Sequence, residues 1–349
     1  MNVQQTDVPG IAVGNVTAWL EANVAGATGP FEFHQIAGGH SNLTFRVTGR
    51  DGTQYVLRRP PLGHLLASAH DVGREHRIIS ALAGTEVPVA PVLGMCTDVD
   101  VTGTPFYVMA FVDGIVARTT DIVTDTLDVA ARGAASASLI ETLAALHAID
   151  PASVGLGDLG RQENYIARQL KRWYGQYEAQ HTERRPDIER AHELLTAQIP
   201  EQGPARIVHG DYRLDNTMVD PSGKVIAVLD WEICTLGDPL ADVGLLMVYW
   251  TGPGDAANAW RQTPTAIEGF WDRAQMAQRY AELSGRDLTN LDYYTAFAFW
   301  KLACIIEGVY SRYLAGALGD VDHADVAHFN REINEASAQS VALLESRRG

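Results

Sequence analysis

The hydrophobic pattern changes once along this chain of 349 residues, and that change limits the folds it can adopt. Up to about residue 111, apolar residues alternate with polar ones in short runs such as Leu43–Thr48 and Gln54–Arg58. The segment Gly49–Gly52 between these two runs contains Arg-Asp-Gly, and alternation on both sides of such a turn predicts a β-hairpin. One helical pattern follows, around Ile78–Leu82. The first third of the chain is therefore expected to form a small antiparallel sheet with one helix.

Beyond residue 112 the apolar positions recur with a period of about 3.6 residues, as in amphipathic helices. This pattern is found in SASLIETLAALHAID, NYIARQLKRWYGQY, ERAHELLTAQI and TAFAFWKLACIIEGVYSRYL. Two strand-like runs, ARIVHG and KVIAVLD, interrupt the helices, and TTDIVTDTLD is expected to be a loop. We therefore predict a bilobal α+β fold, with a small sheet lobe at residues 1–111 and a larger, mainly helical lobe at residues 112–349. The hinge between the lobes is expected at residues 112–116.

The charge of the chain excludes some classes of partner. With 27 basic and 43 acidic residues the formal net charge is -16, whereas a surface that binds a nucleic-acid backbone is basic. The cysteines Cys96, Cys234 and Cys304 lie far apart and form no CxxC pair, which argues against a zinc ribbon or a disulfide framework. The first ten residues lack the features of a secretory signal, and the longest apolar stretches are too short to cross a bilayer. We therefore expect a cytoplasmic protein without a nucleic-acid or membrane partner. The sequence does not determine its oligomeric state.

A polar segment, VHGDYRLDN, lies between the two strand-like runs of the second lobe. Phosphoryl transfer requires a carboxylate that accepts or orients the proton of the nucleophile, oxygen ligands for magnesium, and cationic groups that hold the nucleotide. Asp211 can supply the carboxylate, and the amide oxygen of Asn216 is a suitable magnesium ligand. Asp230, which ends the second run, can supply another ligand if a hairpin brings the strand ends together. Each residue alone is typical of a turn-rich loop, but the three together favour phosphoryl transfer.

These residues belong to an ordered set of motifs. The chain reads His209-Gly-Asp211-Tyr-Arg-Leu-Asp-Asn216, then Leu229-Asp230-Trp231, then Gly237-Asp238-Pro239-Leu-Ala-Asp242. In this order the motifs resemble the catalytic loop H-x-D-x-x-x-x-N, the metal-binding segment and the next helix start of the aminoglycoside phosphotransferase-like family, which has the protein-kinase-like fold. The resemblance covers nearly the whole chain and implies an ATP- and Mg²⁺-dependent phosphotransferase with an alcohol group as acceptor. It also implies that Asp211 is the catalytic base and that Asn216 and Asp230 ligate magnesium.

The same resemblance places the nucleotide against the first lobe. It implies that the turn AGGHSNLTF covers the phosphates and that backbone groups of YVMAFVDG contact the adenine. The cofactor-binding residues implied in this way are Gly39, Ser41, Asn42, Arg58, Glu75, Met109, Phe111 and Val112. Taken alone, the glycine-containing turn also fits an ordinary β-hairpin, and YVMAFVDG also fits a buried strand.

One position departs from the family pattern. Kinase-like folds usually carry a lysine on the third strand, which pairs with the nucleotide phosphates and with a helix glutamate. The segment QYVLRRPP has Arg58 there and no lysine, and Glu75 is its expected partner. Arginine stays charged and can grip phosphate through two N–H groups, so the electrostatic role is preserved while the geometry changes. An arginine here resembles one branch of the family, the phosphotransferase domains related to those fused to acyl-CoA dehydrogenases.

Three residues of the motifs are better explained by structural roles. His209 is expected to be a buried hydrogen-bonding scaffold residue, and Asp242 is expected to hold the backbone of the catalytic loop. Asp238 precedes Pro239 and is expected to cap the next helix. These roles leave the chemistry to the loop carboxylate and the two metal ligands.

The residues that bind the acceptor are less clearly marked. The candidates are Arg213 and Asp215 inside the catalytic loop, Tyr165 and Arg172 in one helical segment, and Trp300 and Glu307 in another. Helical spacing would put the members of each pair on one face, although such residues on apolar helices also serve in packing and surface pairing. An aminoglycoside site needs clustered carboxylates. These helices instead mix Arg, Lys, Trp and Tyr, which favours a carboxylated, phosphorylated or partly apolar acceptor.

Two functions of different class fit the sequence. The first is a small-molecule kinase that transfers the γ-phosphoryl group of ATP to a hydroxyl group. Its acceptor is a hydroxyacyl-CoA or another metabolite, an antibiotic sugar or an amino alcohol, in that order of preference. The second is a catalytically inactive nucleotide-binding module, which the missing strand lysine suggests. A metal-dependent hydrolase built on His209 and Asp211 lacks the clustered histidines of a zinc site, and the complete set of base and metal ligands favours the kinase.

Overall fold

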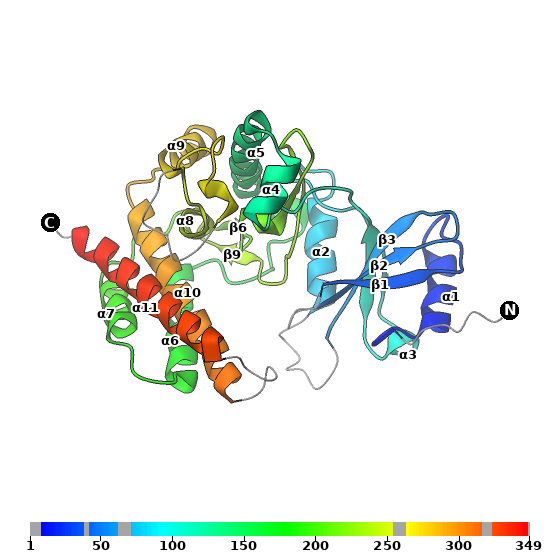
Figure 1. Cartoon of the computed structure of the whole chain (residues 1–349), viewed down its shortest axis with the longest axis horizontal. Helices are drawn as coiled ribbons and strands as arrows, with labels where there is room; N and C mark the ends of the chain where they lie inside the picture. The colour runs from blue at the N-terminus through cyan, green and yellow to red at the C-terminus, as the bar shows by residue number, and fades with distance from the viewer. Residues whose placement is uncertain (1–7, 38–41, 62–70, 254–262, 316–322, 348–349) are drawn as a thin grey trace. The chain divides into compact units, whose positions relative to one another are not determined.

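The computed structural model of the chain describes residues 8–37, 42–61, 71–253, 263–315 and 323–347 (Figure 1). The chain divides into two compact units. Unit 1 consists of Met1–Gly114 and Ile226–Glu232, and unit 2 consists of Ile115–Val225 and Ile233–Gly349. The first segment thus ends at Gly114 where the sequence suggested residue 111, and the chain returns to unit 1 for one short stretch that contains Asp230.

Unit 1 is built on a five-stranded antiparallel sheet with the strand order β1-β2-β3-β5-β4. The strands are β1 (Glu32–Ala37), β2 (Leu43–Thr48), β3 (Gln54–Arg59), β4 (Val92–Cys96) and β5 (Phe106–Ala110). Strands β2 and β3 form the predicted hairpin, in which Leu43 pairs with Arg59 and Thr48 pairs with Gln54. The small antiparallel N-terminal sheet is therefore confirmed.

One face of this sheet packs in a hydrophobic cluster with helix α1 (Val13–Asn23). Phe45 and Leu57, on neighbouring strands, are both fully buried in this cluster. The sequence predicted a single helix in this lobe, but α1 and the four-residue helix α3 (Val99–Thr102) are also present. The start of α1 carries no side-chain cap on its boundary residue Ala12, so the usual sequence signal for a helix start is missing.

The other face of the sheet carries charged and hydroxyl groups. Successive residues of a strand point to opposite faces, so Arg58 lies opposite Leu57, together with its register partner Tyr107 on β5. Helix α2 (Val72–Leu82) is the predicted helix of this lobe and contacts β4 and β5. It buries Glu75 in its first turn, and this places a carboxylate against the arginine.

Unit 2 is mainly helical. Its helices are α4 (Thr120–Thr126), α5 (Val129–Ala148), α6 (Tyr165–Gln180), α7 (Pro186–Ala197), α8 (Leu240–Tyr249), α9 (Arg273–Ser284), α10 (Leu291–Leu314) and α11 (His323–Ser346), with short 3-10 turns η1 (Pro151–Val154), η2 (Leu214–Asn216) and η4 (Pro264–Ala266). Helix α10 is central, because it contacts α6, α7, α8 and α11. Figure 1 shows α10 and α11 running side by side. The prediction of a loop at TTDIVTDTLD is wrong: Thr119 caps α4, and Val123 is buried beneath it.

Four short strands carry the polar motifs. They are β6 (Arg206–Val208), β7 (Thr217–Val219), β8 (Val225–Val228) and β9 (Thr235–Gly237). Strand β6 pairs antiparallel with β9, with Val208 opposite Thr235. The chain leaves unit 2 within β8 and re-enters it before β9. The polar segment therefore begins where a paired, buried strand ends.

Helix α5 is the one described helix that is long and apolar enough to cross a membrane, with a mean hydropathy of 1.2. The sequence had suggested that no stretch reaches this length. Half of the helix is buried inside the structure, where it packs against α9. The three cysteines are free and buried.

Candidate active site

The loop that follows β6 is held by its backbone. The carboxylate of Asp242, in the first turn of α8, accepts hydrogen bonds from the backbone N–H groups of His209 (2.7 Å) and Gly210 (2.8 Å). Gly210 has a φ of 86°, and a Cβ atom there would lie 3.1 Å from the carbonyl oxygen of Ile233. This turn therefore requires glycine. The predicted role of Asp242 as a clamp of the loop backbone is confirmed.

Asp242 is itself held by two helices of unit 2. Nε2 of His147 on α5 lies 3.3 Å from Oδ2 of Asp242, and Nδ1 of His147 lies 2.7 Å from the hydroxyl group of Tyr280 on α9. Burial opposes the charge of Asp242, but the hydrogen bond and charge of His147, the charge of His209 and the N–H of Gly210 together bring its pKa below the ordinary value. Burial lowers the pKa of His147, while the hydrogen bond to Asp242 and its negative charge oppose this shift. The buried clamp is therefore an ionised carboxylate held by an imidazole.

Asp238 caps the start of helix α8, but the helix begins one residue later than predicted. The helix begins at Leu240, so Pro239 is the boundary residue rather than the first helical residue. Oδ1 of Asp238 nevertheless accepts the N–H of Leu240 at 3.1 Å, and its Oδ2 accepts the hydroxyl group of Tyr294 at 2.6 Å. Asp238 therefore joins the start of α8 to α10.

Asp211 is oriented by residues of its own loop. Nδ2 of Asn216 donates to the backbone oxygen of Asp211 (2.9 Å) and to its Oδ2 (2.7 Å), and Nε of Arg213 lies 3.3 Å from the same Oδ2. Nδ1 of His209, a fully buried residue, accepts the N–H of Asp211 at 3.3 Å, as expected of a scaffold residue. The side chain of Asp211 keeps 26% of its surface exposed, so a ligand can reach it. Burial of the remainder raises the pKa of Asp211, against the opposing charge of Arg213, which makes it a stronger base than an ordinary carboxylate.

A buried lysine supports the same loop from α10. Nζ of Lys301 donates to the carbonyl oxygen of Gly210 at 3.1 Å and lies 5.5 Å from the ring centre of Trp173. Burial lowers the pKa of Lys301, while the negative charge of Asp211 opposes this shift. The residue before Asp211 is thus held at its N–H by a carboxylate and at its carbonyl oxygen by an ammonium group.

In unit 1, Arg58 forms the centre of a cluster of carboxylates. Its Nε lies 2.8 Å from Oε2 of Glu75, so the predicted pair is present. Its Nη2 lies 3.1 Å from Oδ1 of Asp230 and 3.8 Å from Oε2 of Glu232. The predicted partner therefore accounts for only one of three acidic contacts.

Glu75 is fully engaged within this cluster. Besides Arg58, it accepts hydrogen bonds from Nδ2 of Asn42 and from the hydroxyl group of Tyr107, the latter at 3.0 Å. Burial raises the pKa of Glu75, although Arg58 opposes the shift. Burial also works against the charge of Arg58, but Glu75 and the other acidic neighbours raise the pKa of the guanidinium above its ordinary value. The pair is therefore a tightly bonded, buried ion pair.

Each unit contains one residue with an oxygen of the kind that binds magnesium. Asp230 has a φ of 61°, unusual for a residue other than glycine, and its side chain is 32% exposed. Only Oδ1 of its carboxylate contacts Arg58, which leaves Oδ2 for another partner. In unit 2, Nδ2 of Asn216 faces Asp211, and no hydrogen bond within the described ranges engages its Oδ1. A carboxylate oxygen and an amide oxygen are the hard ligands that magnesium prefers.

The segment predicted to contact adenine ends strand β5. Met109 lies within the sheet ladder, and the N–H of Phe111 donates to the carbonyl oxygen of Gln54 at 3.4 Å. Val112 lies beyond the strand, and the backbone of this residue makes no hydrogen bond to another backbone group in the part of the chain that the structure describes. Of the phosphate-covering turn, Asn42 is described, while Gly39 and Ser41 lie outside the described residues.

The predicted acceptor residues fall into two groups. Trp300 and Glu307 are fully buried and committed to the fold, so the structure does not support their assignment to a substrate site. The indole N–H of Trp300 donates to the carbonyl oxygen of Ile188, and Glu307 forms an ion pair with Arg185 at 3.1 Å. Helical spacing placed both on one helix but could not say which neighbours cover them.

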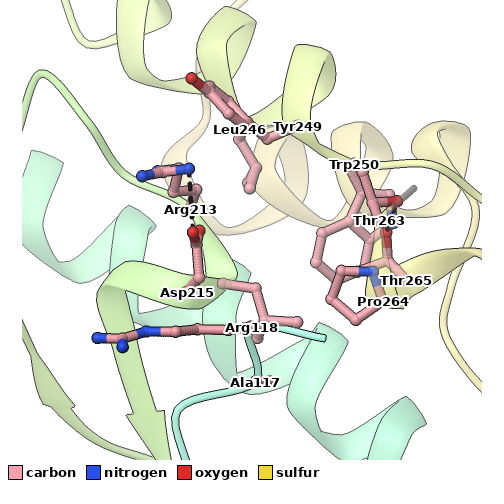
Figure 2. Close-up of a pocket in the computed structure, with 11 residues that line it drawn as sticks. Ala117, Arg118, Arg213, Asp215, Leu246, Tyr249, Trp250, Thr263, Pro264 and Thr265 are labelled. Atoms are coloured by element: carbon pink, nitrogen blue, oxygen red, sulfur yellow. Dashed lines mark hydrogen bonds and ion pairs between the residues drawn. The ribbon is translucent and has the colours of Figure 1, made fainter. Parts of the chain in front are cut away.

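The other predicted acceptor residues differ in exposure. Tyr165 is buried, and its ring occupies the space beside Gly237. Arg172 is exposed and lies 5.2 Å from the ring centre of Trp173. Arg213 and Asp215 form an ion pair at 3.0 Å. This pair lines a pocket beside the catalytic loop (Figure 2), whereas Tyr165 lines a much smaller cavity together with Gly210 and Lys301.

Comparison with known proteins adds independent findings. Residues 32–285 match the model of the phosphotransferase enzyme family. A solved structure from Ralstonia eutropha, assigned to the aminoglycoside phosphotransferases, is 32% identical, with a TM-score of 0.80 over 95% of this chain and 98% of the other. A structure of an aminoglycoside phosphotransferase with ADP and hygromycin B has a TM-score of 0.62 at 16% identity, covers 96% of this chain and 99% of the other, and shares the fold.

Two relatives are longer proteins. The mouse acyl-CoA dehydrogenase family member 10 is 37% identical over 294 residues, which are 83% of this chain and 27% of the relative. The probable acyl-CoA dehydrogenase IBR3 of Arabidopsis thaliana is 35% identical over 319 residues, which are 84% of this chain and 38% of the relative. The chain thus spans between a quarter and two fifths of the length of these two relatives.

Proposed function

Since this chain belongs to the phosphotransferase enzyme family, we propose that it is an ATP- and Mg²⁺-dependent kinase that phosphorylates a hydroxyl group of a small molecule. The observation that carries the proposal is the construction around Asp211. Its carboxylate is accessible, has a raised pKa and is oriented by Asn216, while Asp242 holds the two preceding residues through their backbone. A carboxylate held in this way is suited to accept the proton of an acceptor hydroxyl group.

The nucleotide site of the proposal uses unit 1. Arg58 carries a permanent charge and two N–H edges, so it can pair with phosphate oxygens while Glu75 fixes its position. The backbone groups of Val112, which bond to no other backbone group within the described residues, are suited to hydrogen-bond an adenine ring. Structures with the same fold have been determined with ADP or AMP-PNP, which supports nucleotide binding by this chain.

Asn216 and Asp230 are the residues that would hold magnesium. The ion would neutralise negative charge on the transferred phosphoryl group and its leaving group. The protein's own contribution is to keep Nδ2 of Asn216 turned toward Asp211, so that the amide oxygen is presented rather than the amide nitrogen.

For the acceptor, we propose a hydroxylated acyl-CoA or a related metabolite as the first class to test. The support is the similarity to proteins named as acyl-CoA dehydrogenase family members, of which this chain matches only a part. Antibiotic sugars and amino alcohols follow, because neighbours that share the fold include a macrolide phosphotransferase and a choline/ethanolamine kinase family protein. The buried, free cysteines fit a reducing, cytoplasmic environment.

The test separates binding from transfer. Asp211→Asn should lower kcat by about 100- to 10,000-fold, the range for removing a general base, while the Kd for Mg·AMP-PNP stays unchanged. Glu201→Gln makes the same chemical change at an exposed loop residue and serves as the control. Phosphorylated product would be measured by mass spectrometry after incubation with hydroxylated acyl-CoAs and the other acceptor classes. Wild-type turnover by Asp211→Asn would refute the assignment of the base.

A second function, a nucleotide-binding module without transfer, is favoured by one observation. Arg58 replaces the usual lysine and contacts Asp230, the same carboxylate that would bind magnesium. In this case the protein would bind Mg·ATP with the affinity of a kinase but release no ADP with any acceptor. ADP release that depends on both magnesium and an added acceptor, and that Asp211→Asn abolishes, would exclude this alternative.

A further inference from the structure

A pocket of about 160 Å³ lies beside the catalytic loop within unit 2. Arg118, Arg213 and Asp215 line it together with residues of α8 and η4. We propose that this pocket binds an anionic group of the acceptor, a carboxylate or a phosphate, and that Arg118 is the residue that recognises it. The proposal rests on the proposed kinase function, because it assigns the pocket to the acceptor.

The charges around the pocket differ in how they are paired. Arg213 is occupied: its Nε contacts Asp211 at 3.3 Å and its Nη1 contacts Asp215 at 3.0 Å. Arg118 is exposed, and no hydrogen bond or ion pair of its side chain is present within the described residues. Among the described residues that line the pocket there are therefore two guanidinium groups and one carboxylate, in a chain whose formal net charge is -16. The excess positive charge belongs to Arg118.

The position of Arg118 is fixed by the chain around it. Ala117 is buried, and Ile115 pairs with Val219 in an isolated bridge with backbone hydrogen bonds of 2.8 and 2.9 Å. Figure 2 shows the guanidinium groups of Arg118 and Arg213 on one side of the pocket, and Trp250 on the other. An anion bound between the two guanidinium groups would therefore lie next to Arg213, which contacts Asp211.

Hydroxyl groups add to the excess of donors. The hydroxyl oxygens of Thr263 and Thr265 lie 3.0 Å apart, and the oxygen of Thr265 also accepts the N–H of Thr251 at 3.0 Å. Two hydroxyl groups carry two protons, and one proton suffices for the bond between them. No further acceptor for the second proton is present among the described residues, so this proton can be donated to a ligand, whichever residue donates in the pair. A ligand rich in oxygen acceptors satisfies this pocket better than one rich in N–H donors.

The opposite wall of the pocket is mainly apolar. Leu246, Trp250 and Pro264 line it, and the indole N–H of Trp250 is already donated to the carbonyl oxygen of Trp271 at 2.8 Å. This wall offers apolar contact for a short carbon segment next to the anion. Asp215 is the only carboxylate among the described lining residues that a polyamine could contact, and it is paired with Arg213. The pocket thus disfavours cationic acceptors.

The experiment uses four small probes that each carry a hydroxyl group: 4-hydroxybutyrate, glycerol 3-phosphate, 1,4-butanediol and 4-amino-1-butanol. Binding is measured by NMR titration with saturating Mg·AMP-PNP, which occupies the nucleotide site and prevents turnover. We expect at least one of the two anionic probes to bind at least tenfold more tightly than the neutral and the cationic probe. The stronger of the two identifies whether the anion is a carboxylate or a phosphate. Because the titration measures binding and not phosphoryl transfer, its result can be interpreted even if the protein has no kinase activity.

Variants of Arg118 complete the test. Arg118→Ala should weaken the preferred anionic probe about tenfold, Arg118→Lys should restore part of the affinity, and Arg118→Glu should favour 4-amino-1-butanol. Arg331→Ala removes an exposed arginine of α11 and should leave all four affinities unchanged. The proposal is overturned if the wild-type protein binds the amine as tightly as the acids, if it binds none of the probes, or if Arg118→Ala leaves anion binding unchanged.

Discussion

Replacing Asp242 with asparagine tests the backbone clamp of the catalytic loop. The wild-type carboxylate accepts the N–H groups of His209 and Gly210 at 2.7 and 2.8 Å, and it is 1% exposed. Asparagine keeps one carbonyl oxygen but presents an NH₂ group at the other position. One of the two backbone donors would then face another donor, in a place that water does not reach.

The size of the effect follows from that single unpaired donor. A buried N–H without a partner costs roughly 1–3 kcal/mol, and loss of a hydrogen bond to a charged group costs a similar amount. We take about 3 kcal/mol as the combined effect, since the remaining oxygen keeps one bond. At about 1.4 kcal/mol per factor of ten, the amides of His209 and Gly210 should exchange with solvent roughly 100-fold faster in Asp242→Asn, provided that they exchange through local opening.

Hydrogen exchange followed by mass spectrometry or NMR measures this directly, with Glu201→Gln as the acid-to-amide control on an exposed loop. The effect should depend on pH in a defined direction. The pKa of Asp242 is lowered in the folded protein, so its stabilisation is complete above the unfolded value of about 4 and is lost as the pH falls through the folded pKa. The difference between wild type and Asp242→Asn should therefore be full at pH 6 and shrink below about pH 4. Unchanged exchange at His209 and Gly210 in the variant would refute the clamp.

Two further substitutions test the supports of the site. Glu75→Ala leaves the buried charge of Arg58 without its main partner and should reduce the free energy of unfolding of unit 1 by about 3–5 kcal/mol. Urea denaturation measures this loss, with Glu75→Gln as the milder variant. A loss of stability no larger than that caused by a substitution at an exposed position would contradict the expectation. Lys301→Met removes the donor to the Gly210 carbonyl oxygen but also removes a buried charge, so we expect little change in the free energy of unfolding. We expect kcat to fall at unchanged nucleotide affinity, with partial recovery in Lys301→Arg. An unchanged kcat would show that the loop does not need this bond.

The fold could be predicted because it depends on periodicity, which is a local property of the sequence. Alternation identified the β2–β3 hairpin, and the period of the later segments identified the helices around α10. Helix α4 was missed because TTDIVTDTLD is largely polar and shows no helical period, while the structure stabilises it through the cap of Thr119 and the burial of Val123. A helix of seven residues with one buried side chain leaves too weak a pattern to detect.

Without the family motifs, which pointed to the Arg58–Glu75 pair and to the clamp by Asp242, the candidate site was predictable only where its residues lie close in the sequence. The loop from His209 to Asn216 carries its own contacts, over two to five residues. Tyr107 reaches Glu75 across 32 positions, and no pattern in either segment indicates that pairing. The same limit explains the error at Glu307, whose partner Arg185 is 122 positions away. Spacing along a helix defines a face, but only packing decides whether that face meets solvent or another helix.

Arg58 carries the same positive charge as the lysine that is usual at this position in kinase-like folds, but its side chain has a different geometry. Arg58 contributes one positive charge, while Glu75, Asp230 and Glu232, all within 4 Å of its guanidinium, contribute three negative charges. The cluster therefore carries a net charge of about -2 if all four groups are ionised, and burial makes such an imbalance unfavourable. A divalent cation held by Asp230 would balance this charge, and Arg58 would remain available to pair with phosphate oxygens. Since the forked side chain already contacts Glu75 and Asp230 together, an arginine can hold Asp230, the proposed magnesium ligand, and Glu75 in one arrangement. This gives a physical reason to expect that the substitution preserves nucleotide binding rather than abolishing it.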